Sequence, residues 1–247
     1  MPQAGDLDRR GVSAPLPGDQ PRRGEAGIVD GHGPDAAHPP GPELRRLADA
    51  MRAVTDRMVR TAADPATLAD AAAAVERAVA LLDPVSPPWG ASVPAKPMFD
   101  TDPHHFFPFS PMIGWYSPLS APIECEIRDG AVRGRGTLGA AYEGPPGCVH
   151  GGIIAGLFDE VLGIANIAAG VGAMTGTLTI VYRSPTPLYA ELRFEGRTER
   201  IDGRKVHTVG SLHAGDRLCA EATGIFILVD HERFADQTRL HGAAGMT

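Results

Sequence analysis

The sequence has few of the residues that would mark a secreted or a nucleic-acid-binding protein. It holds only three cysteines, Cys125, Cys148 and Cys219, an odd and sparse set that cannot build a disulfide framework and suits a reducing compartment. Lys and Arg number 23 against 30 Asp and Glu, so the formal charge of -7 offers no broad basic surface to a phosphate backbone. We therefore expect a cytoplasmic protein without a nucleic-acid partner.

Signals for export and membrane insertion are also missing. The N-terminal residues lack the apolar run of a signal peptide. The most apolar stretch, residues 151–170, carries Asp159 and Glu160 near its middle, where a bilayer would make charged side chains costly. We expect neither a signal peptide nor a membrane span.

Motifs for metals and nucleotides are absent as well. The sequence has no Cys-x-x-Cys pair, and His104 and His105 have no further ligands at a standard spacing, so we expect both histidines at the surface or in a loop. No glycine-rich dinucleotide fingerprint and no Walker A run occurs. We predict no metal site and no cofactor.

Composition divides the chain into five segments. Residues 1–43 hold 8 Gly and 8 Pro with few large apolar side chains, which predicts a disordered tail. Residues 44–83 predict a helical hairpin, residues 84–97 a proline-rich linker, and residues 98–230 a folded domain. The last segment, residues 231–247, is polar and predicts a loose C-terminal tail.

The predicted hairpin has two apolar stripes with helical spacing. Each stripe recurs at intervals of three and four residues, and Asp64-Pro65 is a typical cap and first-turn pair between them. The stripes are Leu44, Leu47, Met51, Val54 and Met58, then Leu68, Ala72, Val75, Val79 and Leu82. Such a pair cannot bury both stripes alone, so we expect it to dock on the following domain or on another subunit, with a short coiled coil as the alternative.

The folded domain predicts an α+β arrangement. Residues 123–128 and 131–138 form a strand pair around an Asp-Gly turn, and residues 150–169 form one long apolar helix. Four further strands are expected at residues 175–183, 188–200, 205–213 and 218–229. One apolar helix and an antiparallel sheet large enough to wrap it are the predicted architecture.

Two positions of the long helix could carry chemistry. His150, Gly151 and Gly152 stand at its start, where free backbone amides can bind a developing oxyanion; the alternative is that the glycines only allow close packing. Asp159 lies among apolar residues, where a carboxylate needs a task or a hydrogen-bond partner. Glu160 is turned about 100° from it, so we expect Glu160 in a structural ion pair or in solvent.

The run GPPGCVHGGIIAGLFDEVLG from Gly144 to Gly163, followed by MTGTLTIVYRSPTPL from Met174 to Leu188, resembles the hotdog-fold acyl-CoA thioesterases. The branch that it resembles contains the phenylacetate-pathway thioesterases and the mammalian thioesterase superfamily members. The resemblance covers about residues 110–230. It implies a hotdog fold, an acyl-CoA substrate, and a homodimer or homotetramer with active sites between subunits.

Residue roles follow from the same resemblance. It implies Asp159 as nucleophile or general base, the Gly151 and Gly152 amides as the oxyanion hole, and Thr175 as an assisting hydroxyl. For Thr175 the alternative is an ordinary strand residue that shares its face with Thr177 and Thr179.

Other residues near the helix start receive weaker roles. The stretch from Tyr142 to Gly147 lacks the Asn or Gln that some family members use to polarise the thioester, so His150 either donates to the acyl oxygen or caps the helix. Cys148 invites a Cys/His nucleophile interpretation, but we expect a small buried side chain.

Coenzyme A is anionic and needs local positive charge. We expect some of the arginines and the lysine near strand ends to meet its phosphates, with a solvated hairpin as the alternative; these residues are Arg183, Arg197, Arg200, Arg204 and Lys205. The acyl pocket is expected near Phe158 and residues 106–116. Two rival functions remain open, a hotdog acyl-CoA hydratase or dehydratase and a non-catalytic acyl-CoA binding module.

Overall fold

The computed structural model describes residues 41–86 and 103–229, all within one compact unit that spans Ala37–Thr247. The predicted N-terminal tail, apart from its last three residues, lies outside the described residues. Most of the predicted linker and the predicted C-terminal tail also lie outside them.

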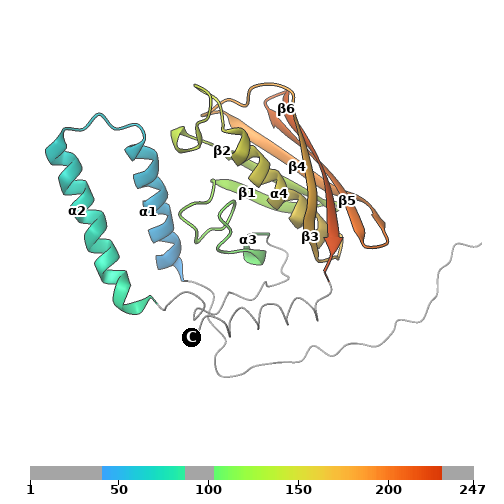
Figure 1. The fold of residues 1–247 in the computed structure, drawn as a ribbon, viewed down its shortest axis with the longest axis horizontal. Coiled ribbons are helices and arrows are strands. Elements are labelled where there is room, and N and C mark those ends of the chain that lie inside the picture. Colours follow the sequence, from blue (N-terminus) through green and yellow to red (C-terminus); the bar gives the residue numbers. More distant parts are fainter. Residues whose placement is uncertain (1–40, 87–102, 230–247) are drawn as a thin grey trace, which may run out of the picture. The chain divides into compact units, whose positions relative to one another are not determined.

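The domain is built on one antiparallel sheet of six strands in the order β1-β2-β4-β5-β6-β3 (Figure 1). The strands are β1 (Ile123–Arg128), β2 (Ala131–Thr137), β3 (Ala173–Tyr182), β4 (Glu191–Asp202), β5 (Lys205–Ala214) and β6 (Arg217–Leu228). Each agrees with a predicted strand to within a few residues. The tight turn after β1 depends on Asp129 and Gly130, which have φ angles of 53° and 73°. Strands β1 and β3 are the two edges of the sheet.

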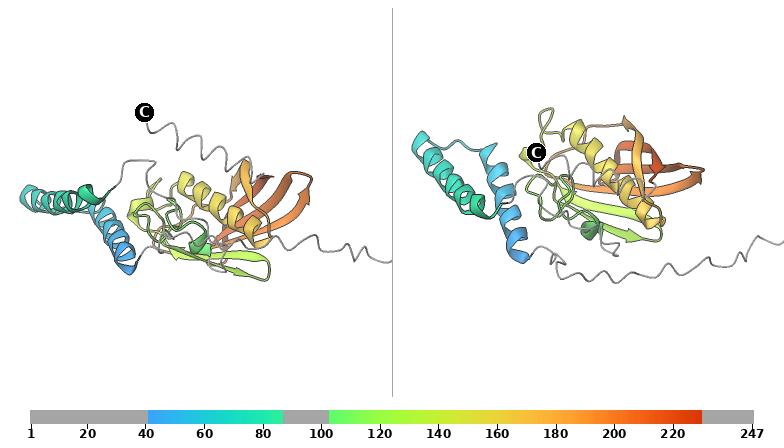
Figure 2. Two further views of the ribbon diagram at one scale, coloured as in Figure 1. Left: turned by 90° about the horizontal axis from the view of Figure 1, so that it is seen from below. Right: turned by 60° about the horizontal axis from the view of Figure 1, so that its bottom comes forward.

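Helix α4 (Gly151–Ala168) lies on one face of this sheet, in contact with β2, β3, β4 and β5 (Figures 1 and 2). Its apolar side, including Leu157, Phe158 and Val161, is fully buried and packs with inward side chains of the strands, such as Phe194. By length and composition alone α4 is long enough and apolar enough to cross a bilayer. The predicted arrangement, an antiparallel sheet around one long helix, is confirmed.

The two N-terminal helices are α1 (Pro42–Met58) and α2 (Pro65–Leu82). The predicted cap between them is present, because the Asp64 side chain accepts a hydrogen bond from the Thr67 amide over 2.8 Å. Short helical turns follow at Asp83–Val85, Pro103–Phe106 (α3) and Ala140–Tyr142.

Helix α1 contacts the domain through two arginines, and its apolar stripe is only partly covered, with Leu47 and Met51 half-buried. Arg52 donates to the Ser120 hydroxyl over 3.0 Å and to the Ser117 carbonyl, and Arg45 lies 4.0 Å from the centre of the Trp115 ring. The stripe residue Val54 remains 42% exposed, and α2 has no buried residue. Within this chain the stripe of α1 is only partly covered and α2 has no buried residue, and docking of the stripes on another subunit stays a prediction.

His104 is a core residue, which corrects the prediction that it lies at the surface. It is 3% exposed and stacks on Trp115 at 4.7 Å. Its Nε2 accepts a hydrogen bond from the Cys125 amide over 3.0 Å, so Nδ1, 3.1 Å from the Ile113 carbonyl, carries the proton. Among residues 41–86 and 103–229, no three His, Cys, Asp or Glu side chains gather as a metal site would need.

Candidate active site

The first half of the candidate site is a hydrogen-bonded pair between α4 and β3. Thr175 Oγ1 donates to Asp159 Oδ1 over 2.6 Å. Asp159 is half-buried and Thr175 is exposed, so the pair stands at the surface of this chain. The bond occupies one carboxylate oxygen of Asp159 and holds the side chain in a fixed orientation.

A β-bulge explains why Thr175 faces the helix. Thr175 pairs with Phe226 on β6, whereas Thr177 pairs with Ile225, and Gly176 is the extra residue between them. Residues directly opposite in an antiparallel pair share a face, so Thr175 lies on the side of the buried Phe226 and Thr177 on the other side. The expectation that Thr177 and Thr179 share the face of Thr175 is therefore wrong.

The second half of the site is the start of α4. The His150 side chain caps the helix, since its Nδ1 accepts from the Gly152 amide over 2.9 Å. A neutral His150 therefore carries its proton on Nε2, where it can donate. Gly151 is the first helical residue, so its amide has no acceptor within the helix. Of the two predicted oxyanion donors, the Gly151 amide is the one left for a ligand.

Tyr182 is a residue of this region that the sequence analysis missed. Its Oη, on β3, donates to the Gly151 carbonyl over 2.7 Å, and the side chain is 52% exposed. Tyr182 thereby ties the edge strand to the helix start, as Thr175 ties it to the helix middle. Its position in the run VYRSP gave no signal for this contact, which depends on the packing of β3 against α4.

The two halves are well separated along the helix. Gly151 and Asp159 are eight residues apart, which corresponds to about 12 Å of helical rise. A thioester carbonyl must lie about 3 Å from both its oxyanion donor and its attacking group. One chain therefore does not present both halves to the same carbonyl.

Among the described residues Glu160 has no ion-pair partner, and it is not in solvent, which corrects the prediction. It is half-buried, and its Oε1 atom is buried without a hydrogen-bond partner among the described residues. Burial raises the pKa of Glu160 to about 7; the Ser110 hydroxyl opposes this and the Asp159 charge adds to it. Residues around Ser110 cover this side of α4, and the sequence did not indicate that packing.

The predicted CoA-binding residues fall into two groups at opposite ends of the sheet. Arg183 follows β3 and pairs with Glu221 over 2.6 Å. Arg200, Arg204 and Lys205 lie at the turn between β4 and β5, and Arg197 pairs with Glu199 over 3.3 Å. Along β6, the partners of Tyr182 and Lys205 are seven residues apart, about 23 Å. One chain does not bring these side chains into a single cluster.

The residues expected in the acyl pocket, and the cysteine near the helix start, lie as follows in the fold. Phe158 is fully buried and packs edge-on against Phe194, with ring centroids 5.4 Å apart, so in this chain it is a core residue; an acyl pocket near it stays a prediction. Cys148 is half-buried. Nδ1 of the nearby His150 already accepts a hydrogen bond from the Gly152 amide, so this nitrogen is not free to act on the Cys148 thiol. Within residues 106–116, Ile113 is buried and Phe109 is 49% exposed.

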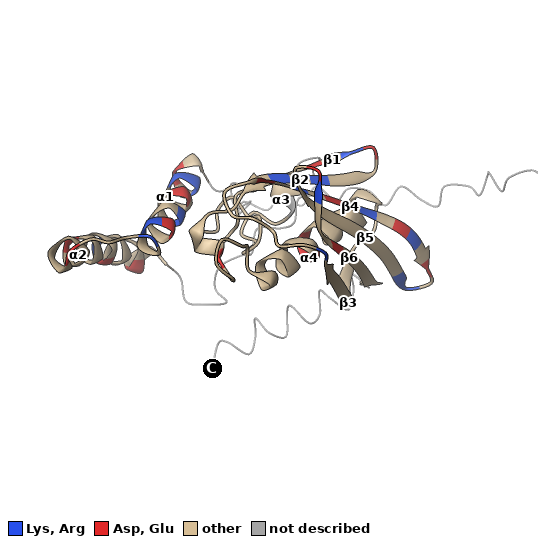
Figure 3. Cartoon of the chain, turned by 90° about the horizontal axis from the view of Figure 1, so that it is seen from above, with Lys and Arg blue, Asp and Glu red and all other residues tan. Residues whose placement is uncertain are grey.

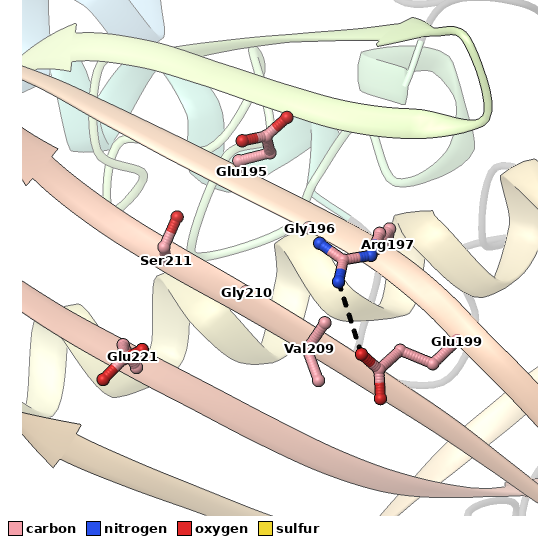
Figure 4. Close-up of a pocket in the computed structure, with 8 residues that line it drawn as sticks. All are labelled: Glu195, Gly196, Arg197, Glu199, Val209, Gly210, Ser211 and Glu221. Carbon is pink, nitrogen blue, oxygen red and sulfur yellow. Dashed lines mark hydrogen bonds and ion pairs between the residues drawn. The ribbon is translucent and has the colours of Figure 1, made fainter.

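Two hollows on the outer face of the sheet contain only Arg197 of the candidate residues. One hollow is lined by Glu195, Arg197 and Glu221, among other side chains of β4, β5 and β6 (Figure 4). A second lies over β1, β2 and β4, where basic side chains are frequent (Figure 3). Both hollows lie away from Asp159.

Comparisons with known proteins point to one family. A family model described as the thioesterase superfamily matches residues 146–221. Acyl-coenzyme A thioesterase THEM4 of Xenopus laevis is 40% identical over 91 residues, which are 36% of this chain and 41% of that protein. THEM4 of Mus musculus is 38% identical over 97 residues, or 38% of this chain and 42% of that protein. The chain thus spans about two fifths of the length of these curated relatives.

A solved structure extends the likeness over most of the chain. The crystal structure of a thioesterase superfamily protein is 35% identical, with a TM-score of 0.67, and the match covers 77% of this chain and 97% of that one. The chain therefore belongs to the thioesterase superfamily, and its fold is the hotdog fold of that family.

Proposed function

We propose that this protein is an acyl-CoA thioesterase that hydrolyses an acyl-CoA to a free acid and CoA. The observation that carries the proposal is the Asp159–Thr175 hydrogen bond, which orients a carboxylate on the family's central helix. The curated relatives named acyl-coenzyme A thioesterases support the substrate class. No metal or cofactor is required for this chemistry.

The reaction uses the free oxygen of Asp159. Either a water that Asp159 deprotonates or Asp159 itself attacks the thioester carbon, and the C–S bond breaks with departure of the CoA thiolate, which takes up a proton. In the second route, water then hydrolyses the acyl–Asp159 anhydride, so both routes consume one water and give the same acid and CoA. The Gly151 amide, aided by His150 Nε2–H, stabilises the negative charge on the acyl oxygen.

The site is completed by a second copy of the chain. Strand β3 is an edge of the sheet, and its side chains remain open, with Met174 55% and Val181 41% exposed. Antiparallel pairing of two β3 edges around a two-fold axis lays one α4 beside the other in the opposite direction. The helix start of one copy then approaches Asp159 of the other, which supplies both halves of the site that lie about 12 Å apart in one chain.

The same pairing reunites the predicted CoA-binding residues. Arg183 of one copy comes to the end of the joined sheet that holds Arg204 and Lys205 of the second copy, because the two β3 strands run in opposite directions. We assign these three side chains to the CoA phosphates. A basic group at the joined end also explains how a chain of net charge -7 receives an anionic substrate.

The test is CoA release from a panel of short, medium, long and aromatic acyl-CoAs, followed with a thiol reagent. A protein-only blank corrects for the half-buried Cys148. We expect wild type to release CoA. The rate for Asp159→Asn should be lower by a factor of about 10² to 10⁴, with an unchanged circular dichroism spectrum. No release from any substrate by folded wild type would overturn the proposal.

A further inference from the structure

We propose that Glu160 selects the acyl group, and that the substrates are acyl-CoAs whose acyl chain carries a hydroxyl group. This inference rests on the proposed thioesterase function and concerns the same site. It depends on three observations: the shape of the α4 face beside Asp159, the unpaired oxygen of Glu160, and the side chain that fills the intervening space.

The face of α4 around the two carboxyl groups is formed by glycine. Gly156 and Gly163 lie three or four residues before and after both Asp159 and Glu160, so they are the helical neighbours of both side chains. A Cβ atom at Gly163 would meet nothing within 4 Å. The two carboxyl groups therefore stand on either side of a helix surface that has room for a chain lying along it.

Met112 occupies part of this space. Its Sδ atom lies 2.4 Å from the place where a Cβ at Gly156 would stand, so the thioether fills the volume that the glycine leaves. Methionine is unbranched and flexible, and its side chain can move aside for a ligand. An acyl chain that replaces the Met112 thioether would lie against Gly156 and reach the Glu160 side chain.

The Glu160 side chain reaches into this space, and its Oε1 atom is buried without a hydrogen-bond partner among the described residues. The Ser110 hydroxyl opposes the raised pKa of Glu160 through a hydrogen bond to its carboxyl group, and the Asp159 charge lies nearby, but Oε1 itself has no partner in the described part of the chain. A buried acceptor left unpaired is destabilising, and a fully apolar acyl chain would leave it unpaired. A hydroxyl on the acyl chain can donate to Oε1, and it can accept from the carboxyl when Glu160 is protonated.

The experiment measures kcat/KM for hexanoyl-CoA and for analogues with a hydroxyl at successive carbons of the chain. We compare wild type with Glu160→Met, an apolar side chain of similar length, and with Glu160→Gln, which keeps both donor and acceptor. Glu124→Met, on the exposed side of β1, is the matched control.

We expect wild type and Glu124→Met to favour at least one hydroxylated substrate by about tenfold or more. Glu160→Gln should keep that preference, whereas Glu160→Met should abolish it, as a ratio of the two kcat/KM values measured with the same variant. Hydrolysis by wild type with no hydroxyl preference would overturn this inference alone, even if Glu160→Met fails to fold. A preference unchanged in folded Glu160→Met, or a loss of dimerisation in both Glu160 variants, would also overturn it. Failure of wild type to hydrolyse any acyl-CoA, by contrast, would overturn the proposed function itself.

Discussion

Thr175 Oγ1 donates to Asp159 Oδ1 over 2.6 Å, and this bond joins the edge strand β3 to the middle of helix α4. It requires the bulge at Gly176, which turns Thr175 toward the helix and Thr177 away from it. The hydroxyl engages Oδ1 of Asp159 and leaves Oδ2 for the reaction that we propose. The orientation of the Asp159 carboxylate therefore depends on an irregularity in an otherwise regular strand.

Removing the Thr175 hydroxyl should lower kcat. We expect kcat of Thr175→Val to be about 10- to 100-fold lower than that of wild type, because a hydrogen bond to a charged group contributes about 1.5 to 3 kcal/mol. Thr175→Ser keeps the hydroxyl and should retain most of the rate. Steady-state kinetics of both variants check this, and equal rates for Val and Ser would show that the bond to Asp159 does not matter.

The Gly151 amide can be removed by proline, and Gly151→Ala adds the same Cβ atom, which would lie 3.3 Å from Tyr182 Oη. Gly151 is the first residue of α4, where proline is tolerated, and His150 has the extended ψ of 131° that precedes proline. Gly151→Pro should lower kcat by about 10² to 10³ through the lost oxyanion donor. Gly151→Ala keeps the amide and serves as the control. A rate for Gly151→Pro close to that of Gly151→Ala would place the oxyanion donor elsewhere.

Glu160 should make stability depend on pH. Its pKa is raised from 4.5 to about 7 in the folded chain. The unfolded carboxyl therefore ionises first, and wild type loses stability as pH rises from 4.5 to about 7. Glu160→Gln does not titrate, so its free energy of unfolding should exceed that of wild type by an amount that grows over this range, on the order of 3 kcal/mol.

Urea unfolding at a series of pH values measures this difference. Glu124→Gln, at an exposed position of β1, is the control and should follow wild type at every pH. A constant difference between Glu160→Gln and wild type from pH 4.5 upward would contradict the raised pKa of Glu160.

Arg52 should hold α1 on the domain. It is 17% exposed and hydrogen-bonds to Ser117 and Ser120, whereas Arg45, the other arginine of α1 at the domain, stacks on Trp115. We expect Arg52→Ala to lower the free energy of unfolding by about 1.5 to 3 kcal/mol and to speed amide exchange in residues 113–120. Arg60→Ala, which removes an exposed pair with Asp56, should change neither quantity. Unaltered exchange in Arg52→Ala would show that α1 is held by other contacts.

The sequence predicted the fold well because its signals are local. Asp129-Gly130 marks a hairpin turn, Asp64-Pro65 marks a helix start, and the apolar run after Gly151 marks the central helix. It also identified Asp159 and Thr175, which the structure places in hydrogen-bond contact.

The failures concern contacts between distant segments. His104 can be buried because the Cys125 amide, 21 residues away in the sequence, satisfies its Nε2 atom with a hydrogen bond. Glu160 is covered by residues near Ser110, and Tyr182 reaches the start of α4 from an edge strand. No periodicity or motif encodes such pairings, since they arise only when loops and strands pack on the helix.

The central claim is that two copies of the chain share each active site, and mixing two inactive variants tests it most directly. Asp159→Asn and Gly151→Pro are each expected to be nearly inactive alone. Co-expression yields mixed dimers in which one site combines both defects and the other has neither, so activity should return to about a quarter of wild type. Mixed dimers that are isolated by two different tags and remain inactive would contradict the shared site.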